Sequence, residues 1–407
     1  MKQSTMATPS SVEVSNYPAR GANSETARDI NRSLVLNGIR TNQPLSRADL
    51  ARQTGLQRST VSLIVEQLIE ERWVVEGPAR QLPRGRRPRL LALNIERAGI
   101  IGVNVMPGAT TIVLADLNAD FRAQETVPTP KKPEEFVKLL CDRVRELMRK
   151  YPDMTYEGLG ISVAGRVDYR TQNLVFAPNL GWHDVNFRTP LERATGLPVQ
   201  IENAANACAL SEVWSGPNKD VSDLIAITVS EGIGTGIIAN GKLVRGPSGA
   251  GGEFGHVTMN EDGPACNCGS RGCWEVYASN TAAIRHYNGG NSKHRAATAS
   301  SVTSFSDLVS LADRQDVSAL ATIQRMAHYL GLGIAMLVTG LAPTVVTIVG
   351  EVTRVWKTVE PIIQRVVAEH APTRAKTRIV PSDDRAQPRL RGTIALVLQK
   401  HFEPRHW

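Results

Sequence analysis

Three cysteines and one histidine, close together in the sequence, are the side chains best suited to do chemistry. They are His256, Cys266, Cys268 and Cys273. Three thiolates and one imidazole form a closed tetrahedral ligand set for Zn²⁺ that leaves no position for water, so they predict a structural zinc site rather than a catalytic one. Buried thiols in a core are the alternative, which the C-x-C spacing and the turn glycines Gly269 and Gly272 disfavour.

Two carboxylates, Glu253 and Glu275, flank this cluster. A metal that holds the loop in shape would also fix the positions of its neighbours. These acids are therefore candidate binding groups, and the alternative is that they are acids on a solvated surface.

The elements that would position these groups follow an α/β pattern that occurs twice. Strands are predicted over 99–106, 111–116 and 121–127, then a helix over Pro133–Lys150 and a strand over 158–163. The order recurs with strands over 224–230 and 235–239, an Asn240-Gly241 turn, a buried strand over 344–349 and a helix over 352–370. This repeat predicts two related lobes with a ligand cleft between them.

Basic residues are concentrated toward the N-terminus. The chain has 407 residues and a formal net charge of +8, and many of its arginines lie in roughly the first 93 residues. Such asymmetry indicates a polyanionic partner, with a solvated basic face as the alternative.

Three predicted helices in this basic region form a helix-turn-helix. The first begins at Ser24 and is broken at 41–44, Ser46 caps a second that Gly55 terminates, and the third covers 57–70. The third helix opens with small or hydrogen-bonding side chains, as a recognition helix that meets base edges and phosphates does. These side chains are Gln57, Arg58, Ser59, Thr60 and Ser62.

A predicted hairpin follows, with strands over 73–75 and 90–93. Its tip carries Arg84, Arg86 and Arg87, side chains suited to a narrow minor groove. The helix spacing, the polar helix start and the arginine-rich wing together predict binding to operator DNA. A helical protein-interaction module is the alternative.

The chain therefore divides into three predicted parts. Residues 1–22 are expected to be a disordered tail, because they are rich in Ser, Thr, Pro and Asn and lack an apolar period. Residues 23–94 are expected to form a winged helix-turn-helix DNA-binding domain, and residues 95–407 a two-lobed body with the zinc site. The stretch 288–304 is either a disordered insertion or a mobile lip of the cleft.

Composition excludes several classes of protein. A content of 42% hydrophobic and 5% aromatic residues is ordinary for a globular protein. No apolar stretch reaches the roughly 20 residues of a membrane span, and the N-terminus lacks a signal pattern. Five cysteines, three of them in the cluster, fit a reducing compartment without disulfides. We therefore expect a cytoplasmic protein with no membrane partner.

The run GAGGEFGH followed by CNCGSRGCWE resembles the ROK family of sugar kinases and sugar-responsive transcription factors. The resemblance covers nearly all of the chain. Repressors of this family, similar to regulators of xylose, glucose and N-acetylglucosamine use, carry a winged helix-turn-helix ahead of a sugar-kinase-like body. The resemblance thus implies an α/β body of two actin/hexokinase-like (ribonuclease H-like) lobes.

The resemblance also implies which residues bind a sugar. The family holds sugar hydroxyls with an Asn-Asp pair, with the Glu and His of a GExGH segment, and with the Glu that closes the zinc motif. The matching residues here are Asn203, Glu253, His256 and Glu275, with Gly165 and Asn179 in less specific cleft-lining segments. Carboxylates accept paired hydrogen bonds from vicinal hydroxyls, and a zinc-bound imidazole keeps one nitrogen free. For Asn203, a helix cap is the alternative role.

The chain departs from the family's kinases at the catalytic positions. The kinases have an Asp that acts as general base where this chain has Ala204, a loss worth about 10²–10⁴ in rate. Their phosphate loop, D-x-G-G-T-K, corresponds to residues 104–110, which lack the Asp, the paired glycines and the Lys. Residues 230–236 keep glycines but start with Ser-Glu, and Glu351 stands near the expected nucleotide side, where the family usually has a second Gly. We expect no catalysis and no ATP or Mg²⁺.

Together these observations predict a sugar-responsive DNA-binding transcriptional regulator, a repressor, with a catalytically inactive effector body. It is expected to bind operator DNA as a homodimer or homotetramer and to respond to a sugar or sugar derivative. Two alternatives remain: a ROK sugar kinase with residual ATP-dependent activity, and a regulator controlled by a transport-protein partner. The identity of the sugar, the direction of its effect and the operator sequence stay open.

Overall fold

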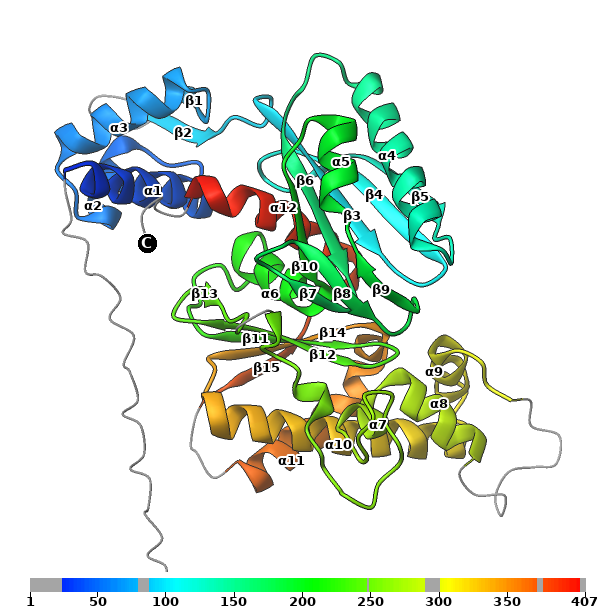
Figure 1. Ribbon diagram of the computed structural model, residues 1–407. Coiled ribbons are helices and arrows are strands. Elements are labelled where there is room, and N and C mark those ends of the chain that lie inside the picture. Colours follow the sequence, from blue (N-terminus) through cyan, green and yellow to red (C-terminus); the bar gives the residue numbers. More distant parts are fainter. Residues whose placement is uncertain (1–23, 80–87, 247–248, 290–300, 372–375, 403–407) are drawn as a thin grey trace, which may run out of the picture.

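The computed structural model describes residues 24–79, 88–246, 249–289, 301–371 and 376–402. These residues form a helical head beside the first of two α/β lobes (Figure 1). The predicted tail, the wing tip with Arg84, Arg86 and Arg87, and most of the stretch 288–304 lie outside the described residues. Among the helices of these ranges, none combines the length and apolarity needed to span a membrane.

The head contains the predicted helices and hairpin. Its helices are α1 (Ser24–Asn42), α2 (Arg47–Thr54) and α3 (Arg58–Glu70), and β1 (Val74–Ala79) pairs antiparallel with β2 (Arg89–Leu93). The Ser46 side chain caps α2 by accepting a hydrogen bond from the backbone N–H of Asp49. Gly55 ends the helix in the left-handed region, at φ 71°. The predicted helix-turn-helix is confirmed.

The first lobe is built on a five-stranded mixed sheet in the order β10-β6-β3-β4-β5. Its strands are β3 (Ala98–Val105), β4 (Ala109–Ala115), β5 (Phe121–Pro128), β6 (Thr155–Val163) and β10 (Val199–Asn203). Helices α4 (Pro133–Lys150) and α5 (Arg188–Thr195) cover one face, and β7 (Arg166–Asp168), β8 (Asn173–Ala177) and β9 (Trp182–Val185) form a small sheet beside it. The rings of Phe136, Trp182 and Phe187 pack together in this core.

The second lobe repeats this plan with the sheet order β13-β12-β11-β14-β15. Its strands are β11 (Leu224–Val229), β12 (Ile233–Ala239), β13 (Lys242–Leu243), β14 (Val345–Val349) and β15 (Arg378–Pro381). In both sheets two antiparallel pairings are followed by two parallel pairings, which confirms the predicted repeat.

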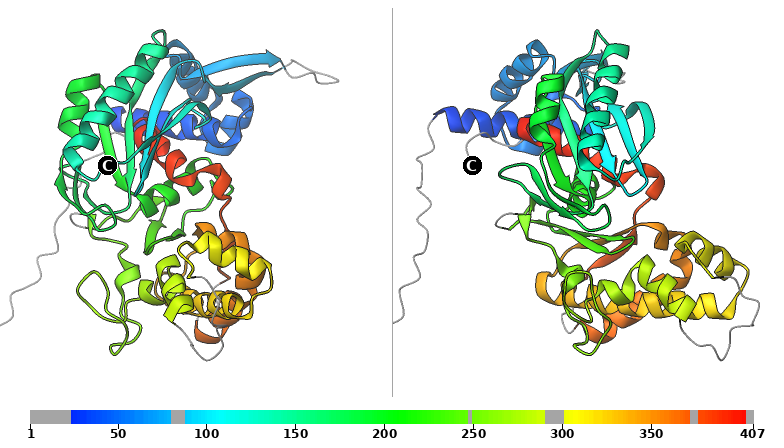
Figure 2. Two further views of the ribbon diagram at one scale, coloured as in Figure 1. Left: turned by 90° about the vertical axis from the view of Figure 1, so that its right-hand side faces the viewer. Right: turned by 45° about the vertical axis from the view of Figure 1, so that its right-hand side comes forward.

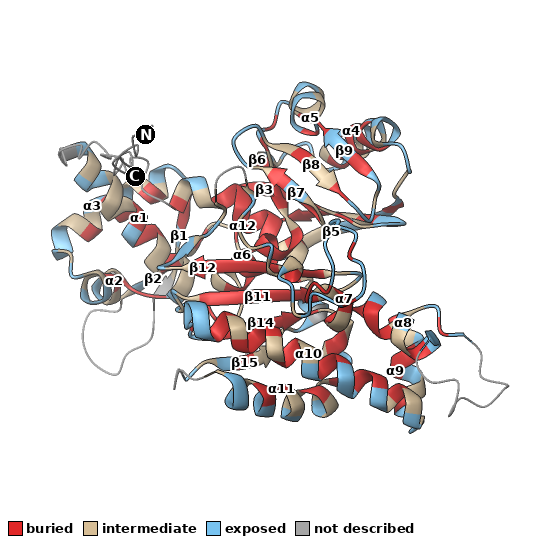
Figure 3. Ribbon diagram, turned by 60° about the horizontal axis from the view of Figure 1, so that its bottom comes forward, coloured by how far each residue is buried: buried red, intermediate tan, exposed pale blue. Residues whose placement is uncertain are grey.

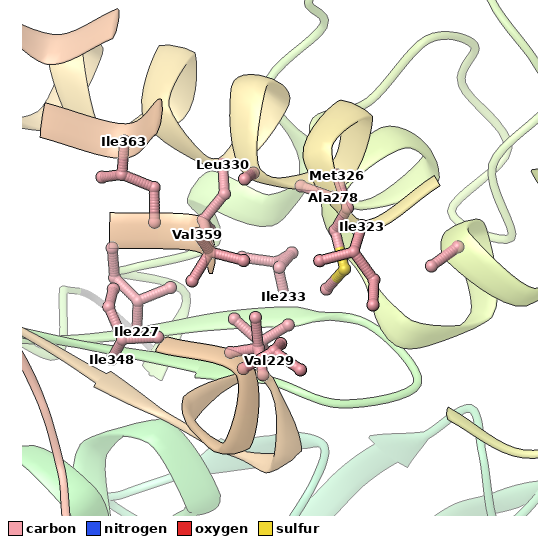
Figure 4. Packing of buried hydrophobic residues seen from close by; sticks show 14 of the residues in the cluster. Ile227, Val229, Ile233, Ala278, Ile323, Met326, Leu330, Ile348, Val359 and Ile363 are labelled. Carbon is pink, nitrogen blue, oxygen red and sulfur yellow. The ribbon is translucent and has the colours of Figure 1, made fainter. Parts of the chain in front are cut away.

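Helices α10 (Val317–Leu341) and α11 (Trp356–His370) cover the outer face of this sheet, with α7 (Glu275–Ala278), α8 (Asn280–Gly289) and α9 (Phe305–Asp313) beside them. Apolar side chains of the sheet, such as Ile227 and Ile348, meet Leu330 of α10 and Val359 of α11 (Figure 4). Residues 352–370 are not one α-helix as predicted. They begin with the 3₁₀ turn η3 (Glu351–Val355), because the backbone N–H of Thr353 bonds the Gly350 carbonyl three residues back.

Two helices lie between the lobes. Helix α6 (Ala204–Trp214) packs against β11 and β12, α12 (Pro388–Phe402) packs against β3 and β6, and the two helices pack on each other. Their backbones touch, since a Cβ on Gly392 would lie 1.9 Å from the carbonyl oxygen of Ala207. Buried residues dominate α12 and the strands around it (Figure 3).

The head shares its core with α12. Figure 2 shows α12, in red, running from between the lobes to the head. Phe402 near its end packs in one buried cluster with Leu36, Leu68 and Trp73 of the head. The head is therefore joined to the body through packed side chains and not only through the chain connection.

Candidate functional site

The four predicted metal ligands come together between η2 (Phe254–His256) and α7. Ligand atoms of His256, Cys266, Cys268 and Cys273 all lie within 4.8 Å of one another. The Cys268 and Cys273 sulfurs are 3.6 Å apart, as are His256 Nδ1 and the Cys266 sulfur. Tetrahedral Zn–S bonds of about 2.3 Å would separate two sulfurs by about 3.8 Å. The donor set and its spacing therefore fit a tetrahedral metal ion bound through His256 Nδ1.

Tight backbone turns hold this loop in place. Gly272 has φ 62°, and a Cβ there would lie 1.6 Å from the carbonyl oxygen of Asn260, so only glycine fits. Burial raises the pKa of the Cys266 and Cys273 thiols. Both thiols are thus protonated at neutral pH unless a metal displaces their protons.

Glu253, His256 and Glu275 form one wall of the candidate site. His256 Nε2, the nitrogen that faces away from the cluster, lies 3.8 Å from a Glu253 carboxylate oxygen. Glu275 lies 3.5 Å from His256 Nδ1 and accepts a hydrogen bond from the backbone N–H of Ile233. Partial burial raises the pKa of Glu253, while His256 and Arg166 act to lower it. Arg166 belongs to β7, so the first lobe faces this wall.

Asn203 stands at the start of α6 and is its N-cap. Its Oδ1 accepts a hydrogen bond from the backbone N–H of Ala205 at 2.7 Å, and its Nδ2 donates to the Gly165 carbonyl at 2.8 Å. The capping role is therefore confirmed, and the side chain keeps one N–H and one lone pair for a ligand. Gly165 lies against β8, where a Cβ would be 2.5 Å from the Phe176 carbonyl oxygen. Asn179 is exposed in the turn between β8 and β9.

Strand β12 brings the two halves of the site together. Gly236 lies against the start of α6, where a Cβ would be 2.2 Å from the carbonyl oxygen of Ala205. The hydroxyl of Thr235, the preceding residue, donates to the carbonyl of Gly252, which is next to Glu253. The predicted sugar-binding residues of the α6 start and of the metal loop thus flank one strand.

An ion pair that the sequence did not predict lies beside Ala204. Arg245 Nε is 2.7 Å from one oxygen of the Glu202 carboxylate. The other oxygen accepts hydrogen bonds, both 2.9 Å long, from the backbone N–H of Asn203 and from the Asn206 side chain. Glu202 is therefore fully engaged and does not replace the missing base. No local spacing signals this pair, because its partners lie far apart in the sequence.

The predicted recognition helix presents its polar start to solvent. Gln57, Arg58 and Ser59 are exposed, and Thr60 and Ser62 are partly exposed. Gln57 occupies the N-cap position without a capping bond from its side chain, which leaves its amide able to contact a phosphate or base. The opposite side of α3, including Val61 and Leu68, is buried in the head.

Helix α6 connects the candidate site to the head. It begins at the cap residue Asn203 and ends at Trp214. The guanidinium of Arg40 in α1 donates to the Trp214 carbonyl at 2.5 Å and lies 4.2 Å from the centroid of the Trp214 ring. Burial lowers the pKa of Arg40 to about 10, so the group stays charged at neutral pH. One rigid helix thus touches both regions.

Comparisons with known proteins agree with this architecture. Residues 100–400 match the ROK family, and residues 39–78 match the IclR helix-turn-helix domain. The xylose repressor of Bacillus subtilis (strain 168) is 34% identical over 322 residues, which are 78% of this chain and 81% of the repressor.

Two solved structures extend the comparison. A ROK family transcriptional regulator, a homologue of the E. coli Mlc protein, is similar with a TM-score of 0.79 at 23% identity, over 93% of this chain and 98% of that one. A ROK family glucokinase from Streptomyces griseus, in complex with glucose and AMPPNP, has a TM-score of 0.66 at 28% identity, over 74% of this chain and 100% of the kinase. The chain therefore belongs to the ROK family, with an actin/hexokinase-like body behind an N-terminal helix-turn-helix region.

Proposed function

We propose that this chain is a sugar-responsive, DNA-binding transcriptional repressor whose body binds a sugar without phosphorylating it. The main support is the position of helix α6. It is capped by a candidate sugar-binding residue, Asn203, and contacts Arg40 of the head at its other end. The similarity to the Bacillus subtilis xylose repressor supports this proposal and makes xylose the first sugar to test.

In the proposed complex the sugar lies between the start of α6 and the metal loop. The carboxylates of Glu253 and Glu275 accept hydrogen bonds from sugar hydroxyls, and Asn203 donates its remaining N–H. Gly165, Asn179 and His256 Nε2 complete the lining. The metal is proposed to be Zn²⁺, which would hold the loop rigid through His256, Cys266, Cys268 and Cys273.

The sugar acts on DNA binding by favouring one arrangement of the lobes. It does so only to the extent that it binds this arrangement more tightly than the other. Because α6 contacts both the site and the head, a shift of its start also moves Trp214, which Arg40 of the head contacts. In a homodimer or homotetramer, that shift changes the separation of paired heads and hence their match to two operator half-sites.

The proposed DNA interface is the head, over residues of about 24–93. The start of α3 contacts base edges and phosphates in the major groove through Gln57, Arg58, Ser59, Thr60 and Ser62. The wing arginines, Arg84, Arg86 and Arg87, contact the DNA backbone or the minor groove.

We also propose that the chain does not phosphorylate the sugar, because of the residues at the start of α6. Ala204 offers no base, and the nearby Glu202 carboxylate is taken up by Arg245, Asn203 and Asn206. ATP and Mg²⁺ therefore have no part in the proposed response.

The test measures xylose binding to the full-length zinc-loaded chain by calorimetry. Asn203→Asp keeps the helix cap but removes the N–H donor, and Glu275→Gln removes the carboxylate charge, so each is expected to weaken binding at least tenfold. Glu369→Gln, at the exposed end of α11, is the charge-matched control. Unchanged affinity in both site variants would refute the site, and no xylose binding by the wild type would favour another sugar or a protein partner.

A further inference from the structure

A polar cavity of about 400 Å³ lies between the lobes. The first lobe contributes Asn104 and Met106 at the end of β3. The second contributes Glu231 and Glu351, which follow β11 and β14, and Asn280 at the start of α8, while Arg389 comes from the first turn of α12. The proposed sugar-binding residues do not line this cavity. Because both lobes form its wall, its shape depends on their relative position.

The charges of this wall do not suit a nucleotide, although the ROK family glucokinase from Streptomyces griseus was solved in complex with AMPPNP. Glu231 and Glu351 place two carboxylates in this wall, which repel phosphates, although Glu351 also lies 3.7 Å from the Arg354 guanidinium. Arg389 is the one cation among the lining residues, and its Nη1 donates to the sulfur of Met106, a weak acceptor, at 3.4 Å. The neighbouring segment 106–110 supplies neither an Asp for a metal nor a Lys for a phosphate.

Three polar atoms of this wall have no hydrogen-bond partner within the described ranges. They are the carboxamide oxygens of Asn104 and Asn280 and the Nε of Arg389. Asn280 is only 9% exposed, and buried polar groups in native proteins are almost always paired. The three residues line one cavity although these atoms are nearly closed to solvent, so a polar ligand would pair with them after a side-chain rotation.

The chemistry of the wall selects the class of ligand. Two carboxylates and the carboxamide oxygens of the wall are acceptors, while the Arg389 guanidinium and the carboxamide N–H groups are donors. A matching ligand must both donate and accept hydrogen bonds, and it must not be an anion. Hydroxyl groups donate and accept, so a neutral polyhydroxyl molecule meets both conditions.

We infer that this cavity is a second effector site for a neutral polyhydroxyl molecule, a sugar or sugar alcohol, and not a nucleotide site. The inference goes beyond the proposed function, which places its sugar at the metal loop. The two sites adjoin at the turn after β11: Glu231 lines the cavity, and a Cβ on Gly232 would lie 2.5 Å from the Glu275 carboxylate.

Helix α12 connects the cavity to the head. Arg389 lies in the first turn of α12, and Phe402 near the other end packs against Trp73 and Trp214. The carbonyl of Phe402 also accepts a hydrogen bond of 2.8 Å from the Asn37 side chain of α1. A ligand at Arg389 therefore acts on the head through α12, whereas a ligand at Asn203 acts through α6.

The test counts binding sites by equilibrium dialysis of radiolabelled xylose, glucose and myo-inositol against the full-length zinc-loaded chain. At least one probe is expected to occupy a site that Glu275→Gln leaves intact and that Arg389→Met weakens at least tenfold. Glu231→Gln, at an exposed position, should weaken the same site without disturbing the fold, and Glu369→Gln should change nothing.

Each outcome decides a separate question. If binding is lost only in Glu275→Gln, the second site does not exist and the proposed function stands. If binding is lost only in Arg389→Met and Glu231→Gln, the second site stands and the site at the metal loop is wrong. Displacement of the probe by Mg-ATP, or no probe bound outside the metal-loop site, overturns the inference.

Discussion

At the start of α6 the residues present hydrogen-bonding groups but no free base. Asn203 keeps one donor and one lone pair after it has capped the helix. Ala204 follows it, and the Glu202 carboxylate is held by three partners. A positioned base is worth about 10²–10⁴ in rate, so this arrangement favours holding a hydroxyl over deprotonating it.

The exposed guanidinium at the start of the recognition helix is expected to matter for DNA. Arg58→Ala removes a charge-assisted contact and should weaken DNA binding roughly tenfold or more, with a shallower dependence on salt. Fluorescence anisotropy with a labelled operator measures this affinity. Arg193→Ala, on α5 far from the head along the chain, removes the same charge and should bind as the wild type does; equal losses in both variants would contradict the interface.

The metal loop is expected to depend on all four ligands. Cys268→Ser should reduce bound zinc from about one ion per chain to none and weaken xylose binding, because Glu275 contacts both His256 and Cys266 in the cluster. Elemental analysis of the purified chain measures the zinc. Cys141→Ser, in α4 outside the cluster, should keep the ion, and full zinc content in Cys268→Ser would show that the metal is held otherwise.

Helices α6 and α12 connect the body to the head. Their backbones touch at Gly392, and each ends on a side chain packed against the head: Trp214 against Arg40, and Phe402 against Trp73. These two helices are therefore the elements that carry a change in lobe position to the DNA-binding surface.

Breaking the contact of α6 with the head is expected to separate sugar binding from the DNA response. Arg40→Met keeps an unbranched apolar side chain but removes both the hydrogen bond to the Trp214 carbonyl and the guanidinium that lies over the Trp214 ring. Sugar affinity should stay within about twofold of the wild type, while the ratio of DNA affinities with and without sugar falls toward one. Anisotropy at saturating xylose measures the ratio. Arg28→Met, at an exposed position of α1, should keep the wild-type ratio.

The molecule as a whole is held together at the junction of head and body. Arg97, which lies 3.9 Å from the centroid of the Trp73 ring, forms an ion pair with Glu157 of β6, and His401 of α12 lies 2.8 Å from the same carboxylate. Burial acts to raise the pKa of Glu157, but hydrogen bonds from His401 and Arg97 outweigh it and hold the pKa at about 2, below the ordinary 4.5.

This depressed pKa makes the junction sensitive to acid. The stabilisation that the ionised Glu157 carboxylate provides is fully present above about pH 4.5 and is lost as pH falls toward 2. In that range the folded protein must take up a proton that the unfolded chain already carries. Between pH 5 and 2 the free energy of unfolding should fall by roughly 2–3 kcal/mol more in the wild type than in Glu157→Gln. Urea denaturation measures both profiles, and parallel profiles would contradict the role of Glu157.

Most of the fold could be predicted from sequence because its signals are local. Ser46 and Gly55 mark helix ends, and the metal ligands follow a short spacing. The pairs Arg40–Trp214, Glu202–Arg245 and Arg97–Glu157 could not be predicted, since each joins residues distant in sequence and no spacing marks them. The 3₁₀ turn over Glu351–Val355 was also missed, because a 3₁₀ turn and an α-helix share similar apolar spacing over one turn.

We propose that sugar binding to the body changes the affinity of the head for DNA without any phosphoryl transfer. The most direct measurement is the operator affinity of the full-length chain as xylose is added, once without nucleotide and once with ATP, with ATP consumption followed in the second series. We expect a saturable change of about 5–150-fold in DNA affinity with no ATP consumed. A DNA affinity that does not respond to any sugar, or that responds only while ATP is hydrolysed, would contradict it.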